Sequence, residues 1–234
     1  AAAANLRYAL PELAQDFEQQ TGNTVAISYA ASGTLTTQIQ HGAPFDVFLS
    51  ADSERPDRLI EKGLALKASR KIYARGQIAL WMPAYTNTAS EESGNLDIRI
   101  LSDNDLAYTL ANPKLAPYGK AAKSLMTAAQ LWRDRDTKRI VAQNIAGAFQ
   151  YVASGAVKVG WVAMAQLKIW EKKHRLPKHS YWLPALDTYP AIEQIAVRTI
   201  ASANPDIADM FLAFLSAPEA QDLIESYGYL TSQE

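Results

Sequence analysis

The alternation of short apolar runs with segments of helical periodicity constrains this chain more than any other feature. Apolar runs of strand length predict strands at 25–29, 45–49, 78–82, 105–110, 139–142, 157–162 and 192–199. Helical patterns lie between or after them, at 6–17, 34–40, near 59–60, at 119–129, 148–152 and 205–226, and a polar loop is expected over 87–95. Strands that alternate with helices pair in parallel sheets, so the sequence predicts an α/β fold.

Small or polar residues stand where several of these helices are expected to begin. Asn5 is the expected N-cap of the first helix, and Gly22 is its expected end. Helix N-termini expose N–H groups without intrahelical acceptors, and in open α/β sheets they gather at the carboxyl ends of the strands. Four such starts are candidate anion sites, although each residue taken alone is also explained as a cap or turn residue: Ala4-Asn5, Ser32-Gly33, Tyr118-Gly119 and Ala146-Gly147.

Charge and residue usage exclude several functions. Lys and Arg number 23 against 24 Asp and Glu, so the net charge of -1 provides no basic field for nucleic acid or an anionic membrane. The chain has no Cys, and His41, His174 and His179 lack the spacing of metal ligands. We therefore expect no nucleic-acid partner, no cofactor and no free-cation site.

Catalytic signatures are also missing from the sequence. It contains no phosphate-binding loop of the G-x-x-x-x-G-K-[ST] type, no G-x-G-x-x-G, no G-x-S-x-G and no H-E-x-x-H. We expect a binding protein and not an enzyme, with no catalytic residues. A hydrolase or transferase remains an alternative, and a His or carboxylate bonded to Ser32 would favour it.

Several blocks of the sequence resemble the periplasmic molybdate-binding proteins, which are solute-binding proteins of ABC transporters. These blocks are "AAAANLRYALPELAQDFEQQTG", "YAASGTLTTQIQHGAPFDVFLSAD", "ANPKLAPYGKAA", "NIAGAFQYVASGAVKVGWVAMAQ" and "SAPEAQDLIESYGY". The most specific is "SG…QI…GAPFDVFLSAD". The resemblance covers nearly the whole chain.

The resemblance implies a periplasmic binding protein of type II-like architecture, with two Rossmann-like lobes joined by two crossing strands and a ligand cleft between them. We expect lobe one at 1–79 and 192–234 and lobe two at 80–191. The family's oxyanion contacts fall on Ala4, Asn5, Ser32, Tyr118 and Ala146, which are the helix starts found above. The implied ligand is molybdate or tungstate, delivered to an ABC permease in the inner membrane.

Further expectations and alternatives accompany this reading. We expect a periplasmic monomer, secreted after removal of a signal peptide, because the chain opens on small residues at Ala1 to Ala4. Many family members carry a Tyr donor where this chain has Ala163. A binding protein for sulfate or another anion, and a ligand-sensing domain of a transcription regulator, remain alternatives. Stacking platforms for a sugar or base are a further reading of Tyr151, Trp161, Trp170, Tyr181 and Trp182, although core packing explains them too.

Overall fold

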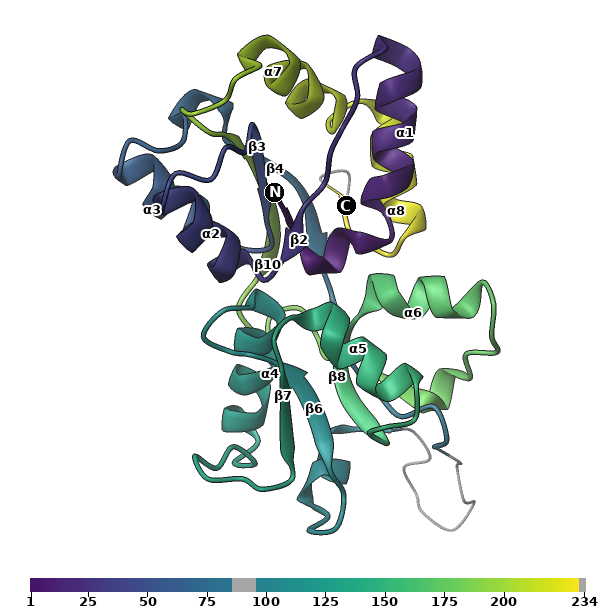
Figure 1. Cartoon of the computed structure of the whole chain (residues 1–234). Coiled ribbons are helices and arrows are strands. Elements are labelled where there is room, and N and C mark those ends of the chain that lie inside the picture. Colours follow the sequence, from purple (N-terminus) through teal and green to yellow (C-terminus); the bar gives the residue numbers. More distant parts are fainter. Residues whose placement is uncertain (86–95, 232–234) are drawn as a thin grey trace. The chain divides into compact units, whose positions relative to one another are not determined.

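The chain folds into two compact units, shown in Figure 1. The computed structural model describes residues 1–85 and 96–231, so the polar loop expected over 87–95 lies outside the described residues. Unit 1 comprises Ala1–Gly76 and Ile192–Glu234, and unit 2 comprises Gln77–Ala191. The chain therefore passes between the units twice. Within the described stretches, no helix combines the length and the apolarity needed to cross a membrane.

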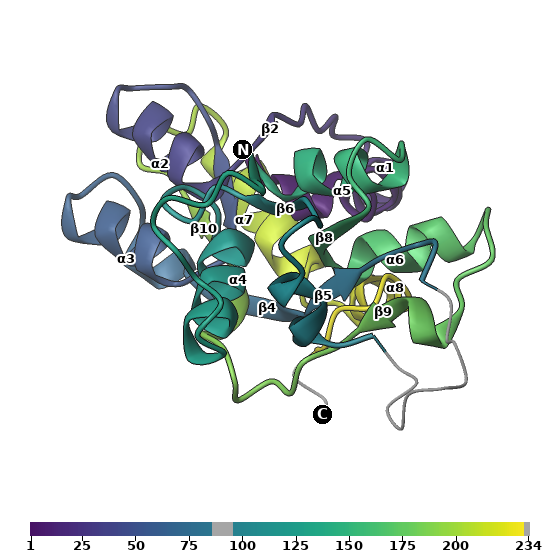
Figure 2. The same cartoon turned by 90° about the horizontal axis from the view of Figure 1, so that it is seen from below.

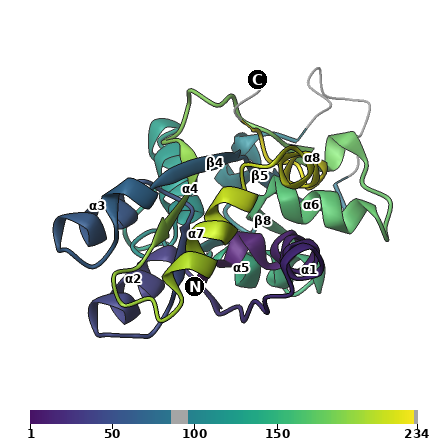
Figure 3. The ribbon, with the colours of Figure 1, turned by 90° about the horizontal axis from the view of Figure 1, so that it is seen from above.

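Unit 1 is a five-stranded sheet with helices on both faces. Its elements are β1 (Ala2–Ala3), β2 (Tyr29–Ala30), β3 (Val47–Ser50), β4 (Lys71–Gly76), β10 (Ile192–Arg198), α1 (Leu10–Thr21), α2 (Ser32–Gln40), α3 (Glu54–Glu61), α7 (Pro205–Phe214), α8 (Pro218–Ser226) and the 3-10 turns η1 (Ala4–Arg7) and η2 (Lys67–Ser69). The strand order is β2-β1-β3-β10-β4, in which β1 is parallel to β2 and β3, and β10 is antiparallel to β3 and β4. Helices α2 and α3 cover one face, and α1 and α7 cover the other (Figures 1 and 3).

Unit 2 repeats this plan. Its elements are β5 (Ile78–Trp81), β6 (Tyr108–Ala111), β7 (Arg139–Ala142), β8 (Val159–Ala163), β9 (Tyr181–Trp182), α4 (Pro117–Ala128), α5 (Ile145–Ala153), α6 (Met164–Glu171) and the 3-10 turns η3 (Ile98–Ser102) and η4 (Lys178–Ser180). The strand order is β7-β6-β8-β5-β9, with β6 parallel to β7 and β8 and β5 antiparallel to β8. Figure 2 shows α4 on one side of this sheet and α5 and α6 on the other.

The two units therefore share one topology around their parallel strands. In each, the first parallel strand lies between the second and the third, as in other doubly wound sheets. The second parallel strand lies on one side of the first and the third lies on the other side. The helices that follow these strands begin at the same edge of the sheet. The fold thus gathers helix starts twice, once in each unit, as the sequence predicted for an α/β protein.

Apolar side chains from the strands and helices form the core of each unit. In unit 1 a cluster unites α2, α3 and the sheet through Leu35, Ile39, Phe48, Leu59, Ile195 and Val197. On the other face, Phe17 of α1 packs edge-on against Phe211 of α7, with ring centroids 5.1 Å apart. Full burial of such side chains stabilises the fold by about 1.5–3 kcal/mol each. This packing fixes the helices on the sheet and thereby fixes the positions of their N-termini.

In unit 2 the aromatic residues pack against one another. Trp81 is fully buried and stacks on Phe149 of α5 at 5.4 Å between ring centroids, while Trp170 of α6 meets Trp81 edge-on at 5.1 Å. Trp161 is also fully buried and lies edge-on to Trp182. These rings fasten α5 and α6 to the sheet, so the contacts favour core packing over stacking platforms for Trp161, Trp170 and Trp182, whereas Tyr151 is exposed and Tyr181 half-buried.

The expected first helix is wrong at its beginning. The chain forms the short turn η1 and then starts α1 at Leu10, so Asn5 is not an N-cap. A continuous α-helix from Leu6 would place Pro11 in its interior, where proline has no N–H to donate. Starting at Leu10 puts Pro11 in the first turn, where no N–H is needed. The end was predicted correctly, because α1 stops at Thr21 and Gly22 takes a left-handed φ of 72°.

Other element limits also differ from expectation. Helix α2 begins at Ser32, and α4 begins at Pro117, which is two residues before the expected start. Strand β2 spans only two residues, because its neighbour β1 is itself only two residues long. The sequence pattern missed β4, a charged edge strand, and α6, whose residues follow β8 without an intervening turn.

Candidate anion-binding site

In unit 1, the candidate donors lie at the ends of two parallel strands, beside the end of a third. Ala4 and Asn5 follow β1 directly, Ser32 follows β2 after a single residue, and Ala51 follows β3. The backbone of Ala4 and Asn5 is buried in the first turn of η1. Because β1 lies between β2 and β3, these positions share the carboxyl edge of one sheet. The structure therefore brings together the three residues predicted in this unit.

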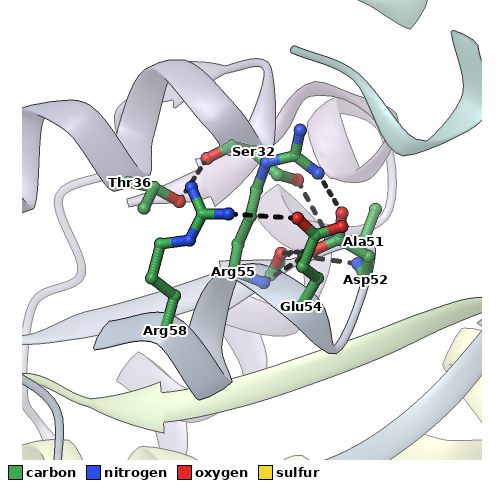
Figure 4. A network of polar contacts seen from close by, with 8 residues as sticks. Ser32, Thr36, Ala51, Asp52, Glu54, Arg55 and Arg58 are labelled. Atoms are coloured by element: carbon green, nitrogen blue, oxygen red, sulfur yellow. Dashed lines mark hydrogen bonds and ion pairs between the residues drawn. The ribbon is translucent and has the colours of Figure 1, made fainter. Parts of the chain in front are cut away.

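Ser32 joins two of these strand ends through its hydroxyl group. Its side chain is 0% exposed, and Oγ accepts a hydrogen bond from the N–H of Ala51 at 3.1 Å (Figure 4). A serine hydroxyl also carries one proton to donate, and Oγ makes no other hydrogen bond among the described residues. The main-chain N–H groups of Ser32 and Gly33 likewise find no acceptor there, because the first intrahelical bond comes from Leu35 to Ala31. Ser32 therefore offers two donors to a ligand.

Asn5 is buried, but its side-chain amide points into unit 1. Gln194 donates its Nε2 to the carbonyl of Ile192, which leaves Oε1 to accept from Asn5 Nδ2 at 2.8 Å. Asn5 Nδ2 also donates to the Tyr229 hydroxyl at 3.0 Å, and that hydroxyl returns a 3.0 Å bond to the Asn5 carbonyl. Both amide hydrogens are thus used within the fold. What this turn offers an anion is main-chain N–H.

Burial also governs the protonation of Tyr229. Burial raises the pKa of this phenol well above its usual value, and the hydrogen bond with Asn5 opposes that rise only in part. The hydroxyl therefore stays protonated and keeps its bond to the Asn5 carbonyl. The turn at Asn5 is held by neutral groups.

An ion pair drawn in Figure 4 joins Asp52 and Arg55 at the start of α3. Asp52 accepts from the Ser50 hydroxyl and from the Arg55 N–H, each at 3.2 Å, and forms an ion pair with the Arg55 guanidinium. Among the described residues, Ser32 has no hydrogen bond to a carboxylate or a histidine. The arrangement that would favour a serine nucleophile is therefore not present in this part of the chain. Sequence reasoning missed Ala51, although its place directly after a buried strand was a usable signal.

In unit 2, Tyr118 is the second residue of α4, which has Ala116 as its N-cap and Pro117 as its first residue. Its N–H lies in the first turn of this helix, at the positive end of the helix dipole. Gly119 holds this turn against the end of β6, because an added Cβ would lie 2.2 Å from the Ala111 carbonyl oxygen. Glycine is required here for close approach.

Ala146 is the second residue of α5, which begins at Ile145. The N-cap is Asn144, whose Oδ1 accepts the N–H of Gly147 at 3.0 Å. The intrahelical ladder starts with the N–H of Ala148, so the N–H of Ala146 has no acceptor among the described residues. The cap therefore satisfies the N–H of Gly147 and leaves the N–H of Ala146 available as a donor.

All of these donors are neutral. Main-chain N–H groups and a hydroxyl can only donate to a fully deprotonated oxyanion, and helix N-termini add partial positive charge. At the end of β8, Ala163 supplies no hydroxyl, and its own N–H donates to Gln166 Oε1 at 2.9 Å. Ala4, Asn5 and Ser32 lie in unit 1, and Tyr118 and Ala146 lie in unit 2.

Two other features do not compete with these donors. A cavity of about 510 Å³ in unit 1 lies at the opposite, amino ends of the parallel strands and is lined largely by apolar side chains such as Phe17, Val25 and Phe211. None of the five predicted residues lines it. The described residues also contain no cluster of three or more His, Cys, Asp or Glu that would hold a metal ion.

Each unit is an open α/β sheet with hydrogen-bond donors for an anion at one edge. Two such units in one chain are typical of a two-lobed solute-binding protein. The sequence model for bacterial extracellular solute-binding proteins matches residues 1–230. The chain therefore belongs to the bacterial extracellular solute-binding protein family. This membership confirms the expected family and the expectation of a binding protein and not an enzyme.

Individual relatives agree with this assignment. The molybdate-binding protein ModA of Rhodobacter capsulatus is 35% identical over 99% of this chain and 87% of its own length. The solved structure of the periplasmic molybdate-binding protein of Azotobacter vinelandii is 34% identical, covers 99% of this chain and 98% of that one, and superposes with a TM-score of 0.87. The sulfate-binding protein SubI of Mycobacterium tuberculosis H37Rv has a TM-score of 0.75 at 16% identity, covering 99% of this chain and 85% of that one, and shows the fold alone. The two-lobed α/β fold is thus confirmed.

Proposed function

We propose that this protein captures molybdate or tungstate and delivers it to a membrane ABC importer. The proposal is carried by one agreement. Molybdate-binding relatives match 99% of this chain, and the residues of this chain that the resemblance marks as ligand contacts offer neutral hydrogen-bond donors. Its ligand contacts are the main-chain N–H groups of Ala4 and Asn5, the N–H and hydroxyl of Ser32, and the N–H groups of Tyr118 and Ala146.

Donor chemistry supports a fully deprotonated oxyanion over phosphate. Phosphate keeps a proton near neutral pH, and that proton requires an acceptor in the pocket. The Asp52 carboxylate near Ser32 is already bonded to Ser50 and Arg55. Each hydrogen bond from a neutral donor to the charged ligand contributes about 1.5–3 kcal/mol, so a handful of donors is sufficient for tight binding.

We further propose that the chain forms two lobes, 1–79 with 192–234 and 80–191, each of which carries its own donors for an oxyanion. The protein is a monomer of the periplasm, formed by removal of a signal peptide, and it docks on the importer's permease in the inner membrane. Family membership supports the location outside the cytoplasmic membrane.

Calorimetric titration of the purified protein with molybdate, tungstate, sulfate and phosphate tests the ligand. We expect saturable one-to-one binding of molybdate and tungstate, with much weaker binding of phosphate. Tighter binding of sulfate would favour the second candidate, a sulfate-binding protein. No saturable binding of any group-six oxyanion would refute the proposal.

A further inference from the structure

Gln166 is a buried polar side chain that the donor set does not include. It is the third residue of α6, is 0% exposed and makes two hydrogen bonds. Its Oε1 accepts the N–H of Ala163, and its Nε2 donates to the carbonyl of Ile145 at 3.2 Å. One partner is an N–H and the other a carbonyl, so the orientation of this amide is determined. Gln166 thus ties the start of α6 to the start of α5.

The Ile145 carbonyl belongs to the same planar peptide group as the N–H of Ala146. In a trans peptide the C=O and N–H bonds point in opposite directions. The Gln166 amide therefore holds one end of the peptide whose other end is the open donor of unit 2. A hydrogen bond accepted at the carbonyl also polarises the group and strengthens donation by its N–H.

We propose that Gln166 is the positioning residue for the Ala146 donor: it fixes and polarises the Ile145–Ala146 peptide so that its N–H is ready for an oxyanion. The inference rests on the proposed function. Two observations support it independently, namely the buried bond at the carbonyl end and the buried N–H of Ala146, which has no acceptor among the described residues.

Unit 1 shows that the equivalent strand end is organised differently. There the N–H after the third parallel strand, at Ala51, is held by Ser32, which also serves as a donor. In unit 2 the N–H of Ala163, the last residue of the third parallel strand β8, is held by Gln166, and the residue at the start of α5 is the apolar Ile145. A glutamine that reaches from α6 thus takes over the bridging that a serine performs in unit 1.

The test is the affinity for sodium molybdate of Gln166→Met, which keeps the length of the side chain and removes both hydrogen bonds. We expect binding to weaken by about tenfold, the size of one lost hydrogen-bond contribution. The matched control is Ser180→Ala, which removes another buried polar bond of unit 2, from the Ser180 hydroxyl to Pro177. We expect the control to bind as the wild type does. Gln166→Ala is the second variant, to be used if the methionine variant does not unfold cooperatively.

A spectroscopic readout separates positioning from a general structural effect. In NMR spectra of the ligand-free protein, we expect the amide proton of Ala146 to move upfield in either Gln166 variant, because its peptide group is less polarised. We expect it to keep its chemical shift in Ser180→Ala. Wild-type affinity together with an unmoved Ala146 resonance would overturn the role of Gln166. If the wild type binds no oxyanion, the proposed function fails, and the Ala146 resonance still decides whether Gln166 organises this peptide.

Discussion

Replacing Ser32 by alanine tests the site at the side chain that has a proton to offer. The wild-type hydroxyl accepts from Ala51 and keeps its own proton for a ligand. Ser32→Ala removes one hydrogen bond to a charged ligand, worth about 1.5–3 kcal/mol, so the dissociation constant for molybdate should rise by about 10- to 150-fold. The substitution also leaves the buried N–H of Ala51 without its acceptor, which costs about 1–3 kcal/mol of folding stability. Calorimetry measures the first effect, and urea denaturation measures the second.

Ser69→Ala is a matched control in the same unit. The Ser69 hydroxyl is also buried; it accepts the N–H of Arg198 at 2.9 Å and donates to the Leu66 carbonyl at 2.7 Å. We expect this control to lose at least as much stability and to keep the wild-type affinity. If Ser32→Ala loses stability while its affinity stays unchanged, Ser32 only braces the strand ends, and our reasoning about its free proton is wrong.

Three further predictions concern the supports of the site. Gly119→Ala places a Cβ against the Ala111 carbonyl, so we expect it to destabilise the fold by about 1–3 kcal/mol in urea denaturation and to weaken oxyanion binding in calorimetry. Tyr229→Phe removes the hydroxyl that bridges two atoms of Asn5; we expect a loss of about 1–3 kcal/mol in folding stability, and an unchanged unfolding midpoint would contradict this bridge. Because the proposed donors are neutral and buried, a tenfold rise in ionic strength should change the dissociation constant by less than about threefold, and a steep dependence in titrations with added salt would point to exposed cations instead.

Local patterns in the sequence predicted several elements closely. Strand β7 spans Arg139–Ala142 as expected, and α1 stops where Gly22 supplies a left-handed residue. These predictions succeed because the responsible interactions are local. Strand alternation, helix periodicity and a glycine after the last helical turn each depend on neighbours in the chain.

Predictions that depended on distant partners were less accurate. The misplaced start of the first helix is a different case, because its cause, Pro11 in the first turn of α1, is local. The direction of the Asn5 side-chain amide could not be predicted from the sequence, because its partners Gln194 and Tyr229 lie 189 and 224 positions away along the chain. No pattern near Asn5 reports those contacts.

The sequence by itself determined that this is an α/β protein with small and polar residues at its helix starts, and its resemblance indicated the family. Only the tertiary structure decided which groups at those starts remain available. The Ser32 oxygen accepts the N–H of Ala51 while its proton finds no acceptor among the described residues, and Asn5 loses its amide donors to Gln194 and Tyr229. The reason is that hydrogen bonding of a buried donor depends on which chain segments meet in space, and that information lies in long-range packing.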